Sequence, residues 1–213
     1  KISHDLRNML SVATMLGDRL EASQDPAVQR IAPRLLASLD RAIHLTEATL
    51  AFGRAEEPAP KLTRLPLRGL VEDVIENERL SDDSAAIEYG CDVAPGLMVR
   101  ADAEQLHRVL SNLVRNARLA ISATGNPGSV TITGRETDEG WEIGVQDTGP
   151  GLPQKARAHL FKPFHGGVRK GGTGLGLAIC AELVKGHGGK LELVRSDADG
   201  TVFRIMLPAG LAT

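Results

Sequence analysis

A short charged segment with two prolines divides this chain of 213 residues into parts with different hydrophobic patterns. The segment spans residues 56–61 and holds Pro58 and Pro60, and proline ends helices because it lacks an amide hydrogen and restricts the residue before it. Before the segment, apolar residues recur with the period of an amphipathic helix. After it, helical periods alternate with the two-residue alternation of strands, so we predict an α+β protein. The predicted regions are a helical hairpin at 1–56, a linker at 57–61 and a mixed domain at 62–213.

The first region is predicted to form two amphipathic helices, residues 2–20 and 27–52. Asp25 stands at the expected N-cap of the second helix and Pro26 at its first position, so the connection is short and the helices are antiparallel neighbours. A hairpin of this size has too little interior to bury both apolar stripes. We therefore expect a second copy to complete a four-helix bundle, which makes the protein a homodimer.

The mixed domain is predicted to be an α/β sandwich in which helices cover one face of a mixed sheet. The predicted helices are 67–80, 103–121 and 173–185, and the predicted strands are 86–93, a short one near Val99, 129–135, 141–147, 190–195 and 201–207.

The composition limits the partners of this chain. With a formal net charge of -2 it has no excess of positive charge for a phosphate backbone, which argues against binding to nucleic acid. No apolar run approaches the roughly 18 residues that a membrane-spanning helix needs, and the first residues lack the apolar core of a signal peptide. We expect a cytoplasmic chain that makes no membrane contact itself.

A histidine near the start lies on the polar side of the first predicted helix. With residues about 100° apart, the apolar stripe lies opposite His4, so its imidazole faces solvent. Asn8 follows one turn later on the same face, and Asp5 lies on the flank. An exposed imidazole is a nucleophile when a neighbouring group accepts the proton of its second nitrogen, as Asp5 could. An isolated His-Asp pair is nevertheless more often an ordinary surface pair, so the pair alone decides nothing.

Two glycine-containing segments and a pair of asparagines form a second candidate site. Residues 147–151, Asp-Thr-Gly-Pro-Gly, directly follow a predicted strand, and glycines there let a ligand approach the backbone closely. Residues 171–176, Gly-Gly-Thr-Gly-Leu-Gly, open a predicted helix whose first N–H groups suit phosphate oxygens. Asn112 and Asn116 share one face of a helix, and the amide oxygen of Asn116 is a ligand type that Mg²⁺ accepts. Each signal alone is weak: a plain turn, a glycine cluster and solvent-facing asparagines would look the same.

The second glycine segment fits neither of the common nucleotide motifs. It is not a P-loop, because no Gly-Lys-Ser/Thr follows, and it is no Rossmann fingerprint, because no parallel strand runs directly into it. A phosphate site here must be of another kind.

The motifs and their order carry a resemblance to a known family. Residues 3–8, Ser-His-Asp-Leu-Arg-Asn, resemble the phospho-acceptor box of histidine kinases. The asparagine pair, then Asp-x-Gly-x-Gly, then Leu-Phe-Lys-Pro-Phe at 160–164, then Gly-x-Gly-x-Gly resemble the ATP-binding domain of histidine kinases, type II topoisomerases, Hsp90 chaperones and mismatch-repair ATPases. Together they resemble the cytoplasmic core of a bacterial sensor histidine kinase. Since the chain begins at Lys1 without a methionine, we expect a sensory region upstream.

The resemblance implies a function for most of these residues. ATP and Mg²⁺ bind, His4 accepts the γ-phosphoryl group, and an aspartate on a response-regulator receiver domain receives it next. Asp5 is implied as general base, and Asn8 as the residue that positions water when the protein acts as a phosphatase. Asp147 is implied to bind the adenine amino group, and Asn116 to bind Mg²⁺. The other residues implied to contact the nucleotide are Asn112, Gly149, Gly151, Lys170, Gly172, Thr173, Gly174, Leu175 and Gly176.

The sequence departs from the family pattern at two positions. Met9 stands where a proline is common, and Leu119 stands where many relatives have Lys or Arg three residues after the Mg²⁺ asparagine. The phosphate contact of that cation is then absent, or it comes from Arg115, Arg118 or a lid at 152–170.

Two other functions are weighed against the kinase. A phosphotransfer adaptor that has lost ATP binding would not keep Asp147, Asn116 and the glycine segments intact. A chaperone-like or repair ATPase offers no reason for the residues around His4.

Overall fold

The computed structural model describes residue 28 and residues 58–80, 86–163 and 174–210. Pro58–Lys162 and Gly176–Thr213 form one compact unit, and Lys1–Glu57 and Pro163–Leu175 are assigned to a second. The predicted hairpin at 2–20 and 27–52 lies outside the described residues, Val28 apart. The described fold is therefore that of the first unit.

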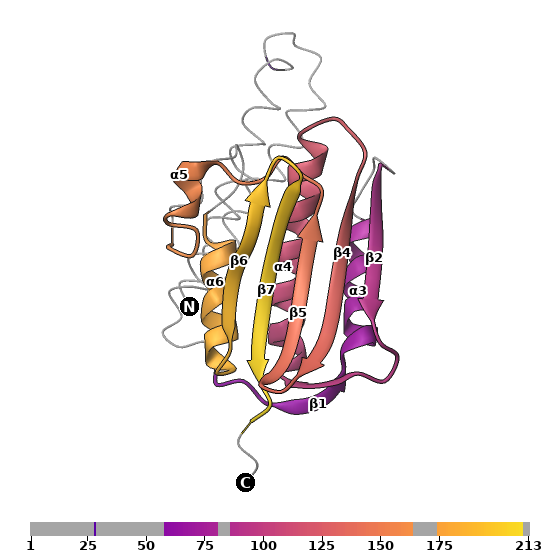
Figure 1. Ribbon diagram of the computed structural model, residues 1–213, viewed down its shortest axis with the longest axis vertical. Coiled ribbons are helices and arrows are strands. Elements are labelled where there is room, and N and C mark those ends of the chain that lie inside the picture. The colour runs from indigo at the N-terminus through magenta and orange to yellow at the C-terminus, as the bar shows by residue number, and fades with distance from the viewer. Residues whose placement is uncertain (1–27, 29–57, 81–85, 164–173, 211–213) are drawn as a thin grey trace. The chain divides into compact units, whose positions relative to one another are not determined.

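The first unit contains a five-stranded sheet with the strand order β2-β4-β5-β7-β6 (Figure 1). β2 pairs with β4 in parallel and the other neighbours are antiparallel, so the predicted mixed sheet is confirmed. The strands are β2 Ile87–Val93, β4 Gly128–Thr137, β5 Gly140–Asp147, β6 Lys190–Asp197 and β7 Gly200–Pro208.

Three helices cover one face of this sheet, as predicted: α3 Leu67–Leu80, α4 Ala103–Ser122 and α6 Gly176–Gly186 (Figure 1). Each helix buries one stripe, and in α4 the stripe follows the three- and four-residue spacing of an amphipathic helix. The alternate residues of the central strands point into the same layer, where Ile132, Ile143 and Ile205 have no exposed surface. One apolar core between the helices and the sheet thus fixes both layers.

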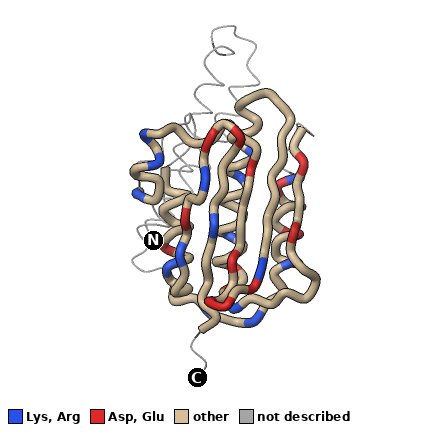
Figure 2. Tube along the Cα trace, viewed as in Figure 1, with Lys and Arg blue, Asp and Glu red and all other residues tan. Residues whose placement is uncertain are grey.

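Figure 2 marks charged residues along the strands, and those that alternate with the buried residues of β4, β5, β6 and β7 belong to the opposite face of the sheet. Glu142 on β5 pairs with Arg135 on β4 and with Arg204 on β7, and Arg204 also lies 3.6 Å from Glu192 on β6. Lys190 extends the series, 2.6 Å from Glu192. Partly exposed pairs of this kind add little stability each, but they keep this face hydrated. The polarity explains why the described helices all lie on the other side.

Two short elements were not predicted. β1 Thr63–Pro66 pairs antiparallel with β3 Met98–Ala101, whose position near Val99 was predicted. β1 has only Leu65 buried and ends in a proline, so its pattern is too short to identify from sequence. α5 Gln154–Arg157 is a single turn within the stretch predicted as a lid.

The third main helix begins later than predicted. The prediction placed its start at residue 173, but α6 begins at Gly176. Gly174 has a φ of +68°, which lies outside the right-handed helical region, so a helix cannot run through it. Among the described residues, no helix combines the length and the hydrophobicity needed to cross a membrane.

Candidate nucleotide-binding site

The candidate site is built along one face of α4. The helix is capped by Asp102, whose Oδ1 accepts a hydrogen bond from the backbone N–H of Gln105 at 3.0 Å. Asn112, Asn116 and Ala120 follow at intervals of four residues, so they lie on successive turns of the same face. The distance along the helix axis from the first to the last of them is about 12 Å.

At one end of this face, the start of α6 packs against Asn112. A Cβ atom placed on Gly176 would lie 3.1 Å from Oδ1 of Asn112, which leaves little room for any side chain there. The Nδ2 group of Asn112 donates to the carbonyl of Arg108 at 3.0 Å, so the orientation of the amide is fixed. The two helices also meet at Cys180 on α6, whose Sγ lies 3.8 Å from the carbonyl oxygen of Val109 on α4. Cys180 is fully buried, and burial raises the pKa of its thiol to about 12. Its thiol is therefore part of the core and stays protonated.

At the other end, the turn that follows β5 packs against Ala120. Asp147 ends β5 and is only 5% exposed, and its Oδ1 accepts the backbone N–H of Gly149 at 2.8 Å. A Cβ atom on Gly149 would lie 3.2 Å from Cβ of Ala120 and 2.9 Å from the carboxylate itself. Thr148 fixes the turn to β4, because its N–H donates to the carbonyl of Ser129 and its Oγ1 accepts the N–H of the same residue. The carboxylate of Asp147 is thus held beside the last turns of α4.

Asn116 lies one turn from each of these two contacts. It is half-buried, and the two contacts bring Gly149 and Gly176 to opposite ends of the stretch that carries it. The structure therefore places Asn112, Asn116 and the turn of Asp147, with these two glycines, along one stretch of α4 that is about 12 Å long.

Gly151 holds the turn after β5 against the end of the sheet. Its φ is +70°, and a Cβ atom there would lie 2.2 Å from the carbonyl oxygen of Asp197. The next residue, Leu152, donates its N–H to Oγ of Ser196 at 2.7 Å. No side chain fits at Gly151 without moving the β6–β7 end of the sheet.

Gly125 provides a matched control for this position, because its φ is +71° but nothing lies within 4 Å of its Cβ position. We expect Gly125→Ala to lower the free energy of unfolding by about 1 kcal/mol, the cost of a left-handed conformation. Gly151→Ala should lower it by about 2 kcal/mol more, because the added methyl collides with Asp197. Urea unfolding followed by the fluorescence of Trp141, the single tryptophan, measures both. Equal losses would mean that the close approach at Gly151 has no energetic weight.

Comparison with known proteins identifies the fold that holds this site. The family of histidine kinase-, DNA gyrase B- and HSP90-like ATPases matches residues 101–211. The chain belongs to this ATPase family. The match includes α4, the turn after β5 and α6, which are the elements that form the site.

The relatives of this ATPase domain are sensory kinases. The sensor-like histidine kinase SenX3 of Mycobacterium tuberculosis is 30% identical over 217 residues, which cover 98% of this chain and 52% of SenX3. The adaptive-response sensory kinase SasA of Nostoc is 29% identical over 225 residues, which cover 96% of this chain and 55% of SasA. The chain thus spans about half the length of these relatives.

Solved structures agree with this relationship. Full-length ShkA in complex with AMPPNP matches 97% of this chain and 44% of its own, with a TM-score of 0.75 and 29% identity. Histidine kinase ThkA in complex with the response regulator protein TrrA matches 98% of this chain and 60% of its own, with a TM-score of 0.70 and 25% identity.

Several of the residues that the resemblance implies for binding or transfer are not placed. His4, Asp5, Asn8, Lys170, Gly172 and Thr173 lie outside the described residues. Gly174 and Leu175 are described but belong to the second unit, so their position relative to the site is not given. Their roles stay predictions.

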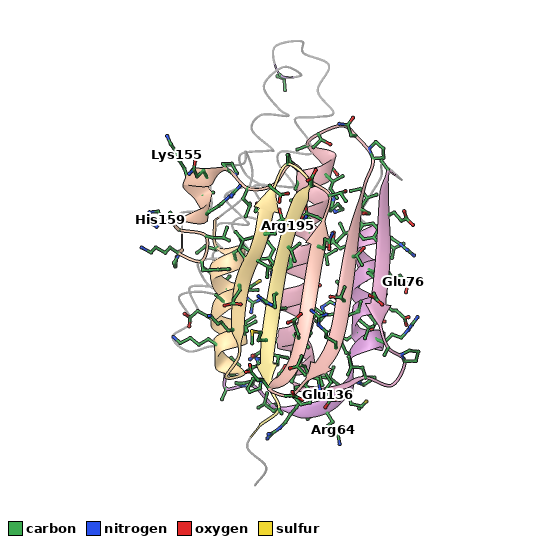
Figure 3. All side chains as sticks on the ribbon, viewed as in Figure 1. Arg64, Glu76, Glu136, Lys155, His159 and Arg195 are labelled. Atoms are coloured by element: carbon green, nitrogen blue, oxygen red, sulfur yellow. The ribbon has the colours of Figure 1, made fainter. Side chains whose placement is uncertain are left out.

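The structure places some of the cations that were considered for the phosphate contact in place of Leu119. Arg118 makes an ion pair with Glu78 on α3, with 2.8 Å between its Nε and the carboxylate, so it is bound to a neighbouring helix. Arg115 is exposed. Lys155 and His159, on α5 and the turn after it, project away from the sheet (Figure 3). Of the arginines considered in place of Leu119, Arg118 is thus engaged with α3, whereas Arg115 makes no ion pair with another described residue.

Sequence reasoning missed the residues that pack against the turn after β5 and fix its position. Ala120 could have been found, because it lies four residues after Asn116 on the same helical face. Ser196 and Asp197 could not, because nothing local to residues 195–200 indicates contact with a turn more than 40 residues earlier. The site residues themselves were identified from motifs, and their supports come from tertiary packing.

Proposed function

We propose that this protein is an ATP-dependent histidine kinase. It binds ATP along α4, transfers the γ-phosphoryl group to its own His4, and passes it to an aspartate on the receiver domain of a response regulator. The observation that carries the proposal is the packing of Gly176 on Asn112 and of the turn after Asp147 on Ala120, at the two ends of the α4 stretch that carries Asn116 in an ATPase-family fold. Its similarity to a sensor-like histidine kinase and to a sensory kinase supports a histidine as the acceptor.

The adenine end of the nucleotide is assigned to Asp147. Its Oδ1 accepts the N–H of Gly149, which orients the carboxylate, and a carboxylate oxygen is the acceptor that the adenine amino group requires. Gly149 and Gly151 have no side chains, so the base can approach the backbone of this turn. The residues present therefore fit a purine with an exocyclic amine.

The phosphate end is assigned to the start of α6. The backbone N–H groups at a helix N-terminus suit phosphate oxygens, and Gly176 places this terminus against Asn112. By resemblance, Lys170, Gly172, Thr173, Gly174 and Leu175 contact the nucleotide from the same glycine segment. The solved complex of ShkA with AMPPNP supports a nucleotide as the ligand.

Asn116 would hold Mg²⁺ between these two ends. An amide oxygen is a hard ligand that Mg²⁺ accepts, and the ion usually completes its shell with phosphate oxygens and water. When bound, the ion offsets the negative charge that builds up on the phosphates during transfer.

Transfer itself depends on the placement of His4. A ring nitrogen of His4 attacks the γ-phosphorus, the bond to the bridging oxygen breaks and ADP leaves, while Asp5 accepts the proton from the second ring nitrogen. Because phosphoryl transfer needs in-line positioning, the ATP-binding unit and residues 1–56 must approach each other. In a separate phosphatase reaction, Asn8 would position a water that attacks the phosphorylated aspartate of the partner and releases inorganic phosphate.

The assembly follows from the same proposal. Residues 1–56 form the dimerisation hairpin, so the protein is a homodimer in the cytoplasm. The solved complex of histidine kinase ThkA with the response regulator TrrA supports a receiver domain as the partner.

Incubation with ATP labelled at the γ-phosphate tests the proposal. We expect label on the protein that is lost in acid and kept in alkali, the signature of a phosphohistidine, and that moves to one member of a panel of purified receiver domains. An ATPase of the chaperone or repair type would release labelled phosphate and leave the protein unlabelled. That result would rule out the kinase.

A further inference from the structure

The segment that enters the ATP-binding unit is held at several points. The carbonyl of Pro58 accepts a hydrogen bond from Nε2 of Gln105 at 2.9 Å. The backbone N–H of Lys61 donates to Oδ2 of Asp102, also at 2.9 Å. Between these two bonds, Cδ of Pro60 lies 3.8 Å from the Cβ position of Gly186. Residues 58–61 are therefore fixed to the first turn of α4 and lie against the last residue of α6.

Asp102 joins this segment to the start of α4. Its Oδ1 accepts the N–H of Gln105 and caps the helix, while its Oδ2 accepts the N–H of Lys61. The hydrogen bond from Gln105, with that from Lys61, lowers the pKa of this carboxyl group. The carboxylate is thus ionised at neutral pH and uses both oxygens.

His187 joins the same point to the end of α6. Its Nε2 lies 3.0 Å from the backbone nitrogen of Asp102, and its Nδ1 lies 2.8 Å from the carbonyl oxygen of Leu183. A carbonyl only accepts and an N–H only donates, so Nδ1 must carry a proton and Nε2 must be bare. The ring is 7% exposed. His187 is therefore a buried neutral imidazole with both nitrogens engaged.

These contacts lie on the same two helices that form the nucleotide site. α4 begins at the contacts and carries Asn112 and Asn116 further along, and α6 begins beside Asn112 and ends next to His187. The chain enters past the lower end of α6 and runs into β1 at that end of the sheet (Figure 1). A displacement of the entering segment would thus have to move α4 or α6 with it.

We propose that Asp102, Gln105 and His187 form a linker clamp that positions the nucleotide for transfer to His4. Residues 58–61, which the sequence predicts as part of the linker, then move with the ATP-binding unit, and the pivot between the two units lies before Pro58. The clamp residues are positioning residues that do not contact the nucleotide. The inference rests on the proposed kinase function and adds the device that sets its geometry.

Gln105→Met tests the clamp, because methionine keeps the volume but removes the donor to Pro58. On the full chain we expect the rate of self-phosphorylation at saturating ATP to fall about three- to tenfold, the effect of one lost hydrogen bond. The dissociation constant for ATP should stay within about twofold, and backbone amides of residues 58–62 should exchange with deuterium faster. Glu104→Ala, an exposed residue in the same helical turn, is the matched control and should change neither quantity.

Substitutions of His187 provide a second test that does not depend on Gln105→Met folding. His187→Gln keeps an acceptor that reaches the N–H of Asp102, whereas His187→Asn keeps only the shorter reach toward Leu183. We expect the Gln variant to phosphorylate itself at least about three times faster than the Asn variant at saturating ATP.

The outcomes distinguish failure of the linker clamp from failure of the proposed kinase function. Equal phosphorylation rates in wild type and Gln105→Met, or in the two His187 variants, would overturn the clamp while leaving the kinase intact. A fall in ATP affinity as large as the fall in rate would also overturn it, since it would show a merely structural role. Absence of label on the wild-type chain would overturn the proposed function, and the clamp with it.

Discussion

Asp147→Asn is expected to weaken ATP binding by at least about 100-fold. The substitution is nearly isosteric, and an asparagine oxygen can still accept the N–H of Gly149, so the turn keeps its shape. The second carboxylate oxygen, however, becomes an NH₂ group, which donates and cannot accept a hydrogen bond from the amino group of adenine. The variant therefore places two donors opposite each other and loses the negative charge of the acceptor. Titration calorimetry with a slowly hydrolysed ATP analogue and Mg²⁺ measures the change on the full chain.

Asp92→Asn is the matched control for this variant. Asp92 is an exposed carboxylate on β2, so the same chemical change there should leave ATP affinity within about twofold. If Asp147→Asn bound ATP as tightly as this control, Asp147 would not contact the base, and the nucleotide would have to be placed elsewhere.

His4→Gln is expected to abolish self-phosphorylation while ATP affinity stays within about twofold. Glutamine resembles histidine in size and polarity but has no nitrogen with a free lone pair that can form a bond to phosphorus. Because the ATP site is formed by residues beyond Pro58, binding should not respond. The measurement is label from γ-labelled ATP together with calorimetry on the same preparation.

His44→Gln is the control, since His44 is the other histidine of residues 1–57. It should retain label at close to the wild-type level. Persistent label in His4→Gln would show that another residue accepts the phosphoryl group, and the resemblance of residues 3–8 to a phospho-acceptor box would then be misleading.

Long elements with a clear buried stripe could be predicted from the sequence. α3 has the predicted bounds, and α4 ends one residue beyond its predicted end, because its apolar residues keep helical spacing for five turns. β1 could not be predicted, since four residues with one buried side chain carry no usable pattern. The start of α6 was placed three residues early, because only the backbone reveals the left-handed φ of Gly174.

The site was predicted in its residue types rather than in its geometry. The motifs predicted Asp147 and Asn112 as site residues, and their roles toward a nucleotide stay predictions. That Gly176 packs on Asn112 and Gly149 on Ala120 depends on how α4 meets the sheet, which no local pattern contains. The same holds for Arg118, an available cation in the sequence that the fold pairs with Glu78.

The segment at residues 58–61 has one feature visible in the sequence, its prolines, and one visible only in the structure, its hydrogen bonds to α4. Two prolines disfavour regular structure near residue 58, and among the described residues no helix or strand begins between residue 58 and Thr63. The bonds from Gln105 and Asp102 to this segment join residues more than 40 positions apart, so they could only be found in three dimensions. The boundaries 1–56, 57–61 and 62–213 remain predictions.

A crystal structure of the full chain with a non-hydrolysable ATP analogue and Mg²⁺ tests the account most directly. The adenine amino nitrogen should lie within about 3 Å of a carboxylate oxygen of Asp147. Mg²⁺ should lie about 2.1 Å from the amide oxygen of Asn116, with the triphosphate directed to the start of α6. An analogue bound away from α4, or crystals that stay free of nucleotide at saturating concentration, would contradict the assignment of this site.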